Sequence, residues 1–227
     1  MADPIPIIGG TGALGYGLAL RWARAGEAIV IGSRDAARAE EAAEGIRGEV
    51  PGADVEGLEN AEAAGRGPIV FLTVPFRAQS ETLTNLKEGL SEGQLLVDCT
   101  VPTAAAVSGK ATRVLGVWQG SAAQQAAEMV PEGVTVISAL HTVNANRLAG
   151  DDPLDEDVPI CGDRKVDKAR VARLIERIDG FRTVNAGALE MARIVETLTS
   201  MLISVNVRYK ARSGIRITYL PDEDPWE

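Results

Sequence analysis

Three glycines near the N-terminus have the spacing of a dinucleotide-binding turn. Gly10, Gly12 and Gly15 form the pattern G-x-G-x-x-G between the apolar run "IPII" and the helical stretch "GLALRWARAG". In such a turn the first glycine permits the tight bend, the second lets the backbone approach a pyrophosphate, and the third allows close helix packing. Because the helix N-terminus then faces the phosphates, this segment predicts a nucleotide site.

The strand after this turn ends in residues that indicate which nucleotide is bound. In NAD-binding versions of the turn, an acidic residue about twenty positions further on accepts hydrogen bonds from the ribose 2′-hydroxyl. Here Ser33 and Arg34 occupy that strand end, and Arg38 follows one helical turn later. Two guanidiniums and a hydroxyl can converge on a 2′-phosphate, so we predict NADP as the cofactor. The alternative is that these are solvated charges at the start of a helix.

The elements that position these residues alternate between strand and helix. Short β-branched runs bounded by Gly or Pro are typical of strands buried on both faces, and they are "IPII", "AIVIG", "PIVFLTV", "QLLVDCTV" and "GVTVISAL". The Ala-rich stretches between them, such as "AARAEEAAEGI" and "SAAQQAAEMV", have helical spacing. The pattern predicts an α/β fold with a Rossmann-type parallel sheet in a nucleotide-binding domain over residues 1–149.

The chain changes character after about Ala149. An acidic loop, "GDDPLDED", leads to a strand-like "VPICG", a helix over about 166–178, a strand-like "FRTVNAG" and a long helix over about 189–211. These elements predict a second, smaller C-terminal α/β lobe over residues 150–220 that packs on the first domain. We expect the acidic tail over 221–227, "PDEDPWE", to be disordered.

The composition argues against several classes of partner. The 227 residues carry a formal net charge of -9, which disfavours nucleic acid and membrane surfaces because both are polyanions. No apolar run approaches the roughly 18 residues that a membrane span needs. Two isolated cysteines, Cys99 and Cys161, are too few for a disulfide framework or a zinc site. We therefore expect a cytoplasmic protein without a metal.

Six blocks of the sequence together resemble one known family. They are "GGTGALGYGLALR", "IGSRDAARAEEAA", "FLTVPF", "VISALHTV", "VPICGD" and "RIVETLTSMLISVNVRYKARSGIRI". In this order the chain resembles the NADP reductases that depend on the deazaflavin coenzyme F420. The resemblance implies direct hydride exchange between C5 of the deazaflavin and C4 of nicotinamide, with the two rings stacked in one cleft. The chain departs from the family at Asn144, where Pro is usual, and at Arg38, where Lys is frequent.

The resemblance also implies cofactor contacts by position. Gly214 would lie beside the deazaflavin. The residues expected to contact NADP, with the glycine turn included, are Gly10, Thr11, Gly12, Ala13, Leu14, Gly15, Ser33, Arg34, Arg38, Phe76, Val101 and Ala145. We expect small-molecule coenzymes as partners and a homodimeric assembly.

Direct hydride transfer needs closeness, alignment and exclusion of water, but no protein proton donor at the reacting carbons. We therefore predict no acid–base catalytic residue. His141, the single histidine, follows the run "VTVISAL", and it either orients the deazaflavin or caps a loop. Arg208, Arg212 and Arg216 recur every four residues. Either they hold the phosphate and glutamates of the deazaflavin tail, or they are cations favoured at a helix C-terminus.

Two other functions stay open at the level of sequence. An NADP-dependent reductase of a small imine or keto acid would need a proton donor, and the inner face of the terminal helix offers only Glu196. A non-catalytic NADP-binding module would need no donor at all. Incubation of the protein with the deazaflavin and NADPH would test these alternatives. Only hydride transfer between the two coenzymes bleaches the visible absorbance of the deazaflavin.

Overall fold

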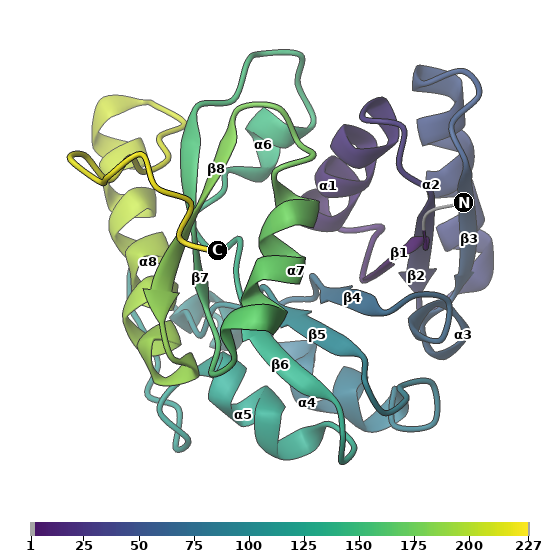
Figure 1. Ribbon diagram of the computed structural model, residues 1–227, viewed down its shortest axis with the longest axis horizontal. Coiled ribbons are helices and arrows are strands. Elements are labelled where there is room, and N and C mark those ends of the chain that lie inside the picture. The colour runs from purple at the N-terminus through teal and green to yellow at the C-terminus, as the bar shows by residue number, and fades with distance from the viewer. Residues whose placement is uncertain (1–2, 227) are drawn as a thin grey trace.

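The apolar runs form the strands of one mostly parallel sheet in the computed structural model, which describes residues 3–226 (Figure 1). Five strands lie where the sequence predicts them: β1 (Ile5–Ile8), β2 (Ile29–Ser33), β4 (Ile69–Leu72), β5 (Leu95–Asp98) and β6 (Thr135–Ser138). All residues of β1, β2, β4 and β5 are buried, which explains their almost entirely apolar composition. The sequence pattern did not reveal β3 (Val55–Glu59), an edge strand that is mostly half-buried.

Most helices of the first part lie between consecutive strands. The Ala-rich stretches form α1 (Ala13–Arg24), α2 (Ala36–Glu49) and α5 (Ala122–Met129), as predicted. Further helical segments that the sequence analysis did not single out are α3 (Asn60–Ala64), α4 (Phe76–Asn85), η1 (Ala104–Val107) and α6 (Ala145–Leu148). Because each crossover returns the chain to the same edge, the loops that follow the parallel strands gather at their carboxyl ends.

The strand order is β3-β2-β1-β4-β5-β6-β7-β8. β1 pairs in parallel with β2 on one side and with β4 on the other, so the direction of the connections reverses between β1 and β4. In open α/β sheets this topological switch point opens a crevice at the carboxyl ends of the strands, where ligands bind. The glycine turn directly follows β1 and therefore lies at this crevice. The Rossmann-type prediction is confirmed by this order.

The C-terminal segment extends the same sheet. Its elements are β7 (Glu156–Cys161), α7 (Lys165–Ile175), β8 (Phe181–Gly187), η2 (Leu189–Met191) and α8 (Ala192–Tyr209). β7 pairs with β6 in the antiparallel sense through Ser138 and Cys161, so the C-terminal strands join the parallel strands of the first part in one mixed sheet. β8 then pairs in parallel with β7. A domain boundary between residues 149 and 150 stays a prediction, because the sheet continues across it.

Two layers of helices bury the two faces of the sheet. One core cluster joins the strands to α1, α2 and α7, with Trp22 of α1 packed 4.7 Å from Phe71 of β4, measured between ring centroids. The other cluster joins the strands to α3, α4, α5 and the start of α8. Within residues 3–226, no helix combines the length and the apolar character needed to cross a membrane.

Arg21 on α1 ties the first part of the chain to the segment that leads into β7. Its guanidinium donates to four backbone carbonyl oxygens, those of Arg147, Leu148, Gly150 and Asp152, at 2.6 to 3.0 Å. One side chain thereby provides hydrogen-bond donors for backbone carbonyl groups at the end of α6 and in the acidic loop after it. Hydrogen bonds from a charged donor are stronger than those between neutral groups, so this contact holds the loop firmly against α1.

The structure differs from the disorder expected for the tail over 221–227. Trp226 is only 7% exposed, and its indole Nε1 donates to Thr183 Oγ1 of β8 at 2.9 Å. It belongs to the core cluster on the α7 face of the sheet. A large aromatic side chain buried with its N–H paired orders the segment that carries it. The expectation was therefore wrong for the described part of the tail, whereas Glu227 lies outside the described residues.

Candidate functional site

The glycine turn brings the start of α1 to the crevice. At Gly15 a Cβ atom would lie 2.5 Å from Thr73 Oγ1 and 2.7 Å from Gly10 Cα, so only glycine allows α1 to approach the turn this closely. Gly12 is the N-cap residue of α1, and no side chain in the described part of the chain caps this helix end. The amides of the first turn are thus available for an anion, as a pyrophosphate site requires.

The first pocket at the crevice, named here the β2 pocket, has a volume of about 440 Å³. Ser33, Arg34 and Arg38 line it together with Thr11 and Gly12 of the glycine turn. Ser33 is buried at the end of β2, whereas both arginines are exposed. The structure therefore brings together the three residues predicted to hold a 2′-phosphate and connects them to the predicted pyrophosphate site.

An acidic residue also lines the β2 pocket. Asp35 accepts hydrogen bonds from the amides of Ala37 and Arg38, at 3.0 and 3.4 Å, and so caps the N-terminus of α2. The cap occupies this carboxylate with backbone amides and spreads part of its charge into the helix. Asp35 accordingly helps to position Arg38 rather than replacing the ribose-binding acid of NAD sites.

Asn60 is a pocket residue that the sequence analysis missed. It is 6% exposed at the start of α3, it lines the β2 pocket, and its Oδ1 has no hydrogen-bond partner within residues 3–226. A buried acceptor without a partner is costly, so it suits a ligand that offers an amino or hydroxyl hydrogen. The signal in the sequence was weak, because Asn60 follows the edge strand β3, which the apolar pattern did not reveal.

The second pocket, named here the β5 pocket, has a volume of about 530 Å³ and adjoins the first. Both are lined by Gly12 and by residues 73–75, which follow β4. The predicted contacts Ala13, Leu14, Phe76 and Val101 line the β5 pocket. Arg77 is the one charged residue among the described side chains that line it, and none is acidic. The wall is otherwise mainly apolar, as suits a planar ring.

Cys99 also lines the β5 pocket and is a small buried side chain. Burial raises the pKa of the Cys99 thiol well above its ordinary value, and the nearby Asp98 carboxylate raises it further. The thiol therefore stays protonated and is a poor nucleophile.

His141 lies just past the end of β6 and is 4% exposed. Burial lowers the pKa of His141 to about 4, so the imidazole is neutral near pH 7. Within the described part of the chain, neither ring nitrogen has a hydrogen-bond partner, and the same holds for Ser138 Oγ and Thr142 Oγ1. Four unpaired polar atoms around one strand end fit a bound polar ring or ordered water. The segment after β6 that carries His141 is held by Thr199 Oγ1 of α8, which donates to the His141 carbonyl at 2.7 Å.

Two residues implied by the resemblance lie away from both pockets. Ala145 begins α6 and packs near Gly17 of α1. Gly214 lies against Glu156, whose carboxylate carbon would be 2.3 Å from a Cβ atom at that position. Neither residue is among those that line the β2 or the β5 pocket. Their contacts with the cofactors stay predictions.

The three arginines at the end of the chain do not form one helical face as expected. α8 ends at Tyr209, and Lys210 adopts a left-handed conformation with φ of 50°, so Arg212 and Arg216 follow in a nonhelical segment. Arg216 forms ion pairs with Asp155 and Asp157, each at 3.0 Å. Arg208 binds Ser204 within its own helix. The fourfold spacing was misleading because nothing in it marks the end of α8.

Glu196, the acid considered as a proton donor, has a structural role. It is 1% exposed on α8 and accepts hydrogen bonds from the amides of Ala122 and Ala123 at 2.9 and 3.1 Å, at the start of α5. Burial raises the pKa of Glu196 to about 8, although these two amides lower it. Both carboxylate oxygens are engaged with backbone, so Glu196 does not face a substrate.

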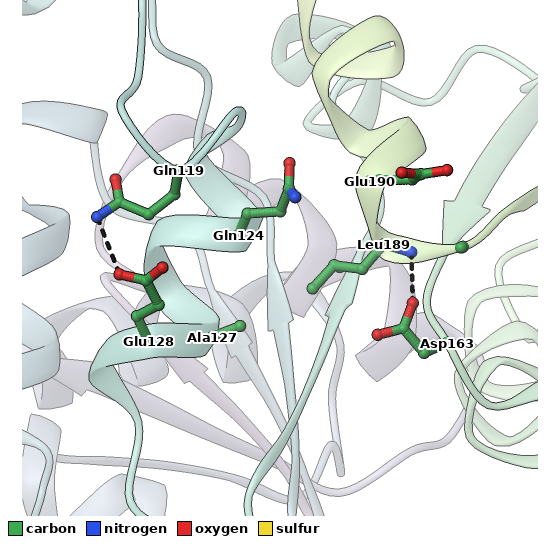
Figure 2. A pocket seen from close by; sticks show the side chains of 8 residues that line it. Gln119, Gln124, Ala127, Glu128, Asp163, Leu189 and Glu190 are labelled. Atoms are coloured by element: carbon green, nitrogen blue, oxygen red, sulfur yellow. Dashed lines mark hydrogen bonds between the residues drawn. The ribbon is translucent and has the colours of Figure 1, made fainter.

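A further hollow of about 440 Å³ lies between α5 and the η2 turn (Figure 2). Three acidic residues, Glu128, Asp163 and Glu190, line it. Two of these carboxylates are held by neighbours, since Gln119 Nε2 donates to Glu128 at 3.1 Å and the Leu189 amide donates to Asp163 at 2.9 Å. The acidic wall is a poor match for a nucleotide or for any other anionic cofactor.

Sequence comparisons agree with this geometry. The model of the family described as "NADP oxidoreductase coenzyme F420-dependent" matches residues 4–102. The F420-dependent NADP reductase of Methanothermobacter thermautotrophicus is 42% identical and covers 99% of this chain and 98% of its own. That of Methanocaldococcus jannaschii is 40% identical over 95% of this chain and 98% of its own.

A solved structure shows the same fold. A crystal structure from Arthrobacter sp. FB24, provisionally named an F420-dependent NADP reductase, superposes with a TM-score of 0.80 at 23% identity, and the match covers 96% of this chain and 100% of that one. The fold is thus of the Rossmann type, and identity to the two archaeal enzymes makes the chain an oxidoreductase. By its identity to the two archaeal enzymes over nearly its whole length, the chain belongs to the family of F420-dependent NADP reductases. The resemblance seen in the sequence is confirmed.

Proposed function

We propose that this protein transfers a hydride directly between NADP(H) and the deazaflavin coenzyme F420. The observation that carries this function is the pair of adjoining pockets at the switch point between β1 and β4. One pocket ends in Ser33, Arg34 and Arg38, and the other has a mainly apolar wall without an acidic side chain. A dinucleotide laid across Gly12 would place its 2′-phosphate in the first pocket and its nicotinamide in the second.

We propose that the residues predicted from the sequence bind the cofactors as follows. Thr11, Gly12 and the first turn of α1 would hold the pyrophosphate through backbone amides, with Ser33, Arg34 and Arg38 on the 2′-phosphate. Leu14, Phe76 and Val101 would contact the nicotinamide end. In this arrangement residues 1–149 supply the NADP site, with Ala145 as a further NADP contact, and residues 150–220 cover it, with Gly214 beside the deazaflavin.

The protein's own groups would act by position and not by proton transfer. The bound deazaflavin supplies the carbon centre that gives or accepts the hydride. His141 is neutral because burial lowers its pKa to about 4, and its unpaired nitrogens are suited to orient a polar ring edge. The β5 pocket has no acidic group among its described lining residues, and Glu196 is engaged with α5. Alignment of two rings and exclusion of water are what this site offers.

An isotope experiment tests the function. NADPH carrying deuterium at the transferred C4 position is mixed with the protein and oxidised coenzyme F420. Loss of the deazaflavin's visible absorbance, with deuterium recovered at its C5, is the expected result, because hydride passes between the two carbons without solvent exchange. Deuterium appearing at C5 from labelled solvent would instead indicate a proton-transfer residue. No bleaching with NADPH would contradict the proposal altogether.

We also propose a homodimer in the cytoplasm. α8 carries large apolar side chains that are at least half exposed, namely Ile194, Met201, Val207 and Tyr209, which supports burial of this helix against a second copy. The two cysteines are unpaired and buried, as is usual for a reducing compartment. Sedimentation velocity measures the mass, and a monomer at micromolar concentration would contradict the dimer.

A further inference from the structure

Acidic residues are almost absent from two segments of this acidic chain. The full sequence holds 32 Asp and Glu against 23 Lys and Arg. Residues 99–127 contain no acidic residue, and residues 191–220 contain only Glu196, which is buried. The same two segments hold seven Lys or Arg residues. They therefore carry local positive charge on a molecule whose overall charge is negative.

The two segments lie side by side in the fold. Ser200 Oγ of α8 donates to the carbonyl of Ala111 at 3.2 Å, and Glu196 of α8 caps the start of α5. In Figure 1 the connection between β5 and α5 accordingly runs beside α8. We call residues 101–120 of this connection the flap loop. Its position joins the two stretches of positive charge into one surface.

The flap loop forms one wall of the β5 pocket. Val101, Thr103, Ala105 and Ala106 line the pocket. The returning half of the loop is fixed to this wall, because Thr103 and Val114 form an antiparallel bridge and the Ala104 amide donates to the Arg113 carbonyl at 2.7 Å. Residues 110–113 are therefore held next to the wall of the pocket.

Two cations of the flap loop are available to a ligand. Lys110 and Arg113 are exposed, and neither takes part in an ion pair or a side-chain hydrogen bond with the described residues. Arg216, in contrast, is neutralised by Asp155 and Asp157. The surface beside the β5 pocket thus carries positive charge that no acidic side chain of the described residues neutralises. The charge of Arg216, in contrast, is already paired.

We propose that Lys110 and Arg113 bind the anionic side chain of the deazaflavin coenzyme while its ring stacks on the nicotinamide at the β5 pocket. This inference rests on the proposed function. The side chain carries a phosphate and glutamates, which the net charge of -9 would otherwise repel. Cations next to the ring pocket favour this coenzyme over deazaflavins that lack the charged tail. They also guide its approach, since opposite charges accelerate encounter.

Binding measurements with two deazaflavins test the proposal. The double variant Lys110→Ser/Arg113→Ser is compared with the unchanged protein and with Lys87→Ser/Arg173→Ser, which removes two exposed cations outside both segments. The probes are oxidised coenzyme F420 and the free deazaflavin that lacks the phosphate and the glutamates. Fluorescence titration gives Kd for each probe at low and high NaCl, with NADPH binding as the check on folding.

The expected result is selective. The flap variant should bind coenzyme F420 about threefold to thirtyfold more weakly, as the loss of two partly exposed charge contacts implies. Its Kd for the tail-free deazaflavin and for NADPH should be unchanged, and its affinity for coenzyme F420 should depend less on salt. The Lys87→Ser/Arg173→Ser control should behave as the unchanged protein.

Three outcomes would overturn the inference. Equal affinity of the flap variant and the unchanged protein for coenzyme F420 would show that these cations do not contact the tail. Equal weakening for both deazaflavins would show that the loop positions the ring instead. If the unchanged protein binds neither deazaflavin but still binds NADPH, the proposed function itself fails along with this inference.

Discussion

At the scale of the residue, the proposed choice of cofactor rests on two exposed arginines at the β2 pocket. Arg34→Ala removes one guanidinium from the proposed 2′-phosphate site, and a hydrogen bond to a charged group contributes about 1.5–3 kcal/mol. We expect KM for NADPH to rise roughly tenfold to a hundredfold, with kcat little changed, because ground-state and transition-state binding weaken alike. Steady-state kinetics with NADPH and NADH measure this effect.

NADH provides the internal control for Arg34→Ala. NADH has no 2′-phosphate, so its kinetics should be almost the same in the variant and in the unchanged protein. Arg173→Ala removes an exposed arginine on α7, away from the pocket, and should alter neither substrate. Equal use of NADH and NADPH by the unchanged protein would contradict the assignment of NADP.

His141 makes a prediction about stability and pH. Its pKa is about 4 in the folded protein because of burial, against an ordinary value of 6.5. Between these values the unfolded chain binds a proton that the folded protein does not. The free energy of unfolding should therefore fall as the pH drops from about 6.5 towards 4, by up to about 3 kcal/mol.

The variant His141→Gln removes this titration. Urea unfolding of both proteins at about pH 7 and pH 5 gives the comparison, and the unchanged protein should lose about 2 kcal/mol more than the variant between these conditions. If the free energies of unfolding of the two proteins differ by the same amount at both pH values, the prediction that His141 is buried in its neutral form is contradicted. Activity of the variant should be reduced tenfold to a hundredfold but not abolished, since the ring would be misplaced rather than deprived of a proton.

The sequence predicted part of the site well at this scale. Ser33, Arg34 and Arg38 could be placed together because a strand end and the next helical turn are local features. Asn60 and the unpaired atoms around His141 could not be found, since burial without a partner depends on which elements pack together. The end of α8 between Arg208 and Arg212 could not be located, because a left-handed Lys210, and not a glycine, ends the helix.

At the scale of the element, the packing of α1 on the glycine turn depends on Gly15. Gly15→Ala would place a methyl group 2.5 Å from Thr73 Oγ1 and 2.7 Å from Gly10 Cα, so backbone must shift. We expect the free energy of unfolding to fall by about 1–3 kcal/mol. The affinity for NADPH should fall as well, because the start of α1 is displaced. Urea unfolding and calorimetric titration measure the two effects.

Gly48 on α2 is the matched control for Gly15. A Cβ atom there has no neighbour within 4 Å, so alanine meets open space. Gly48→Ala should raise the free energy of unfolding by about 0.4–1 kcal/mol, since alanine restricts the unfolded chain and favours the helix. If both substitutions change the free energy of unfolding in the same way, close packing does not explain why position 15 requires glycine.

Elements differ in how clearly the sequence reveals them. Fully buried strands such as β1 and β4 are short apolar runs and could be located directly. β3 contains two glutamates and a glycine, because an edge strand needs no apolar residue on its exposed side, and it could not be recognised. The antiparallel direction of β7 was also hidden, since local composition does not encode which way a strand runs.

At the scale of the whole molecule, the charge is divided between surfaces. The net charge of -9 disfavours polyanions in general, while the flap loop and residues 191–220 themselves contain no exposed acidic residue. Composition alone argues against nucleic acid as a partner, but it could not place this region. Two segments about ninety residues apart in the sequence create it only after the chain has folded.

The contact of Arg21 with the loop over 147–152 limits how the cofactors can enter and leave. A hinge opening at the predicted boundary between residues 149 and 150 would pull this guanidinium from the carbonyl oxygens of Gly150 and Asp152. At about 1.5 kcal/mol for each bond of a charged donor, such an opening costs about 3 kcal/mol. Exchange of the cofactors is then expected to proceed without separating the two parts of the chain, with the sheet acting as a rigid frame.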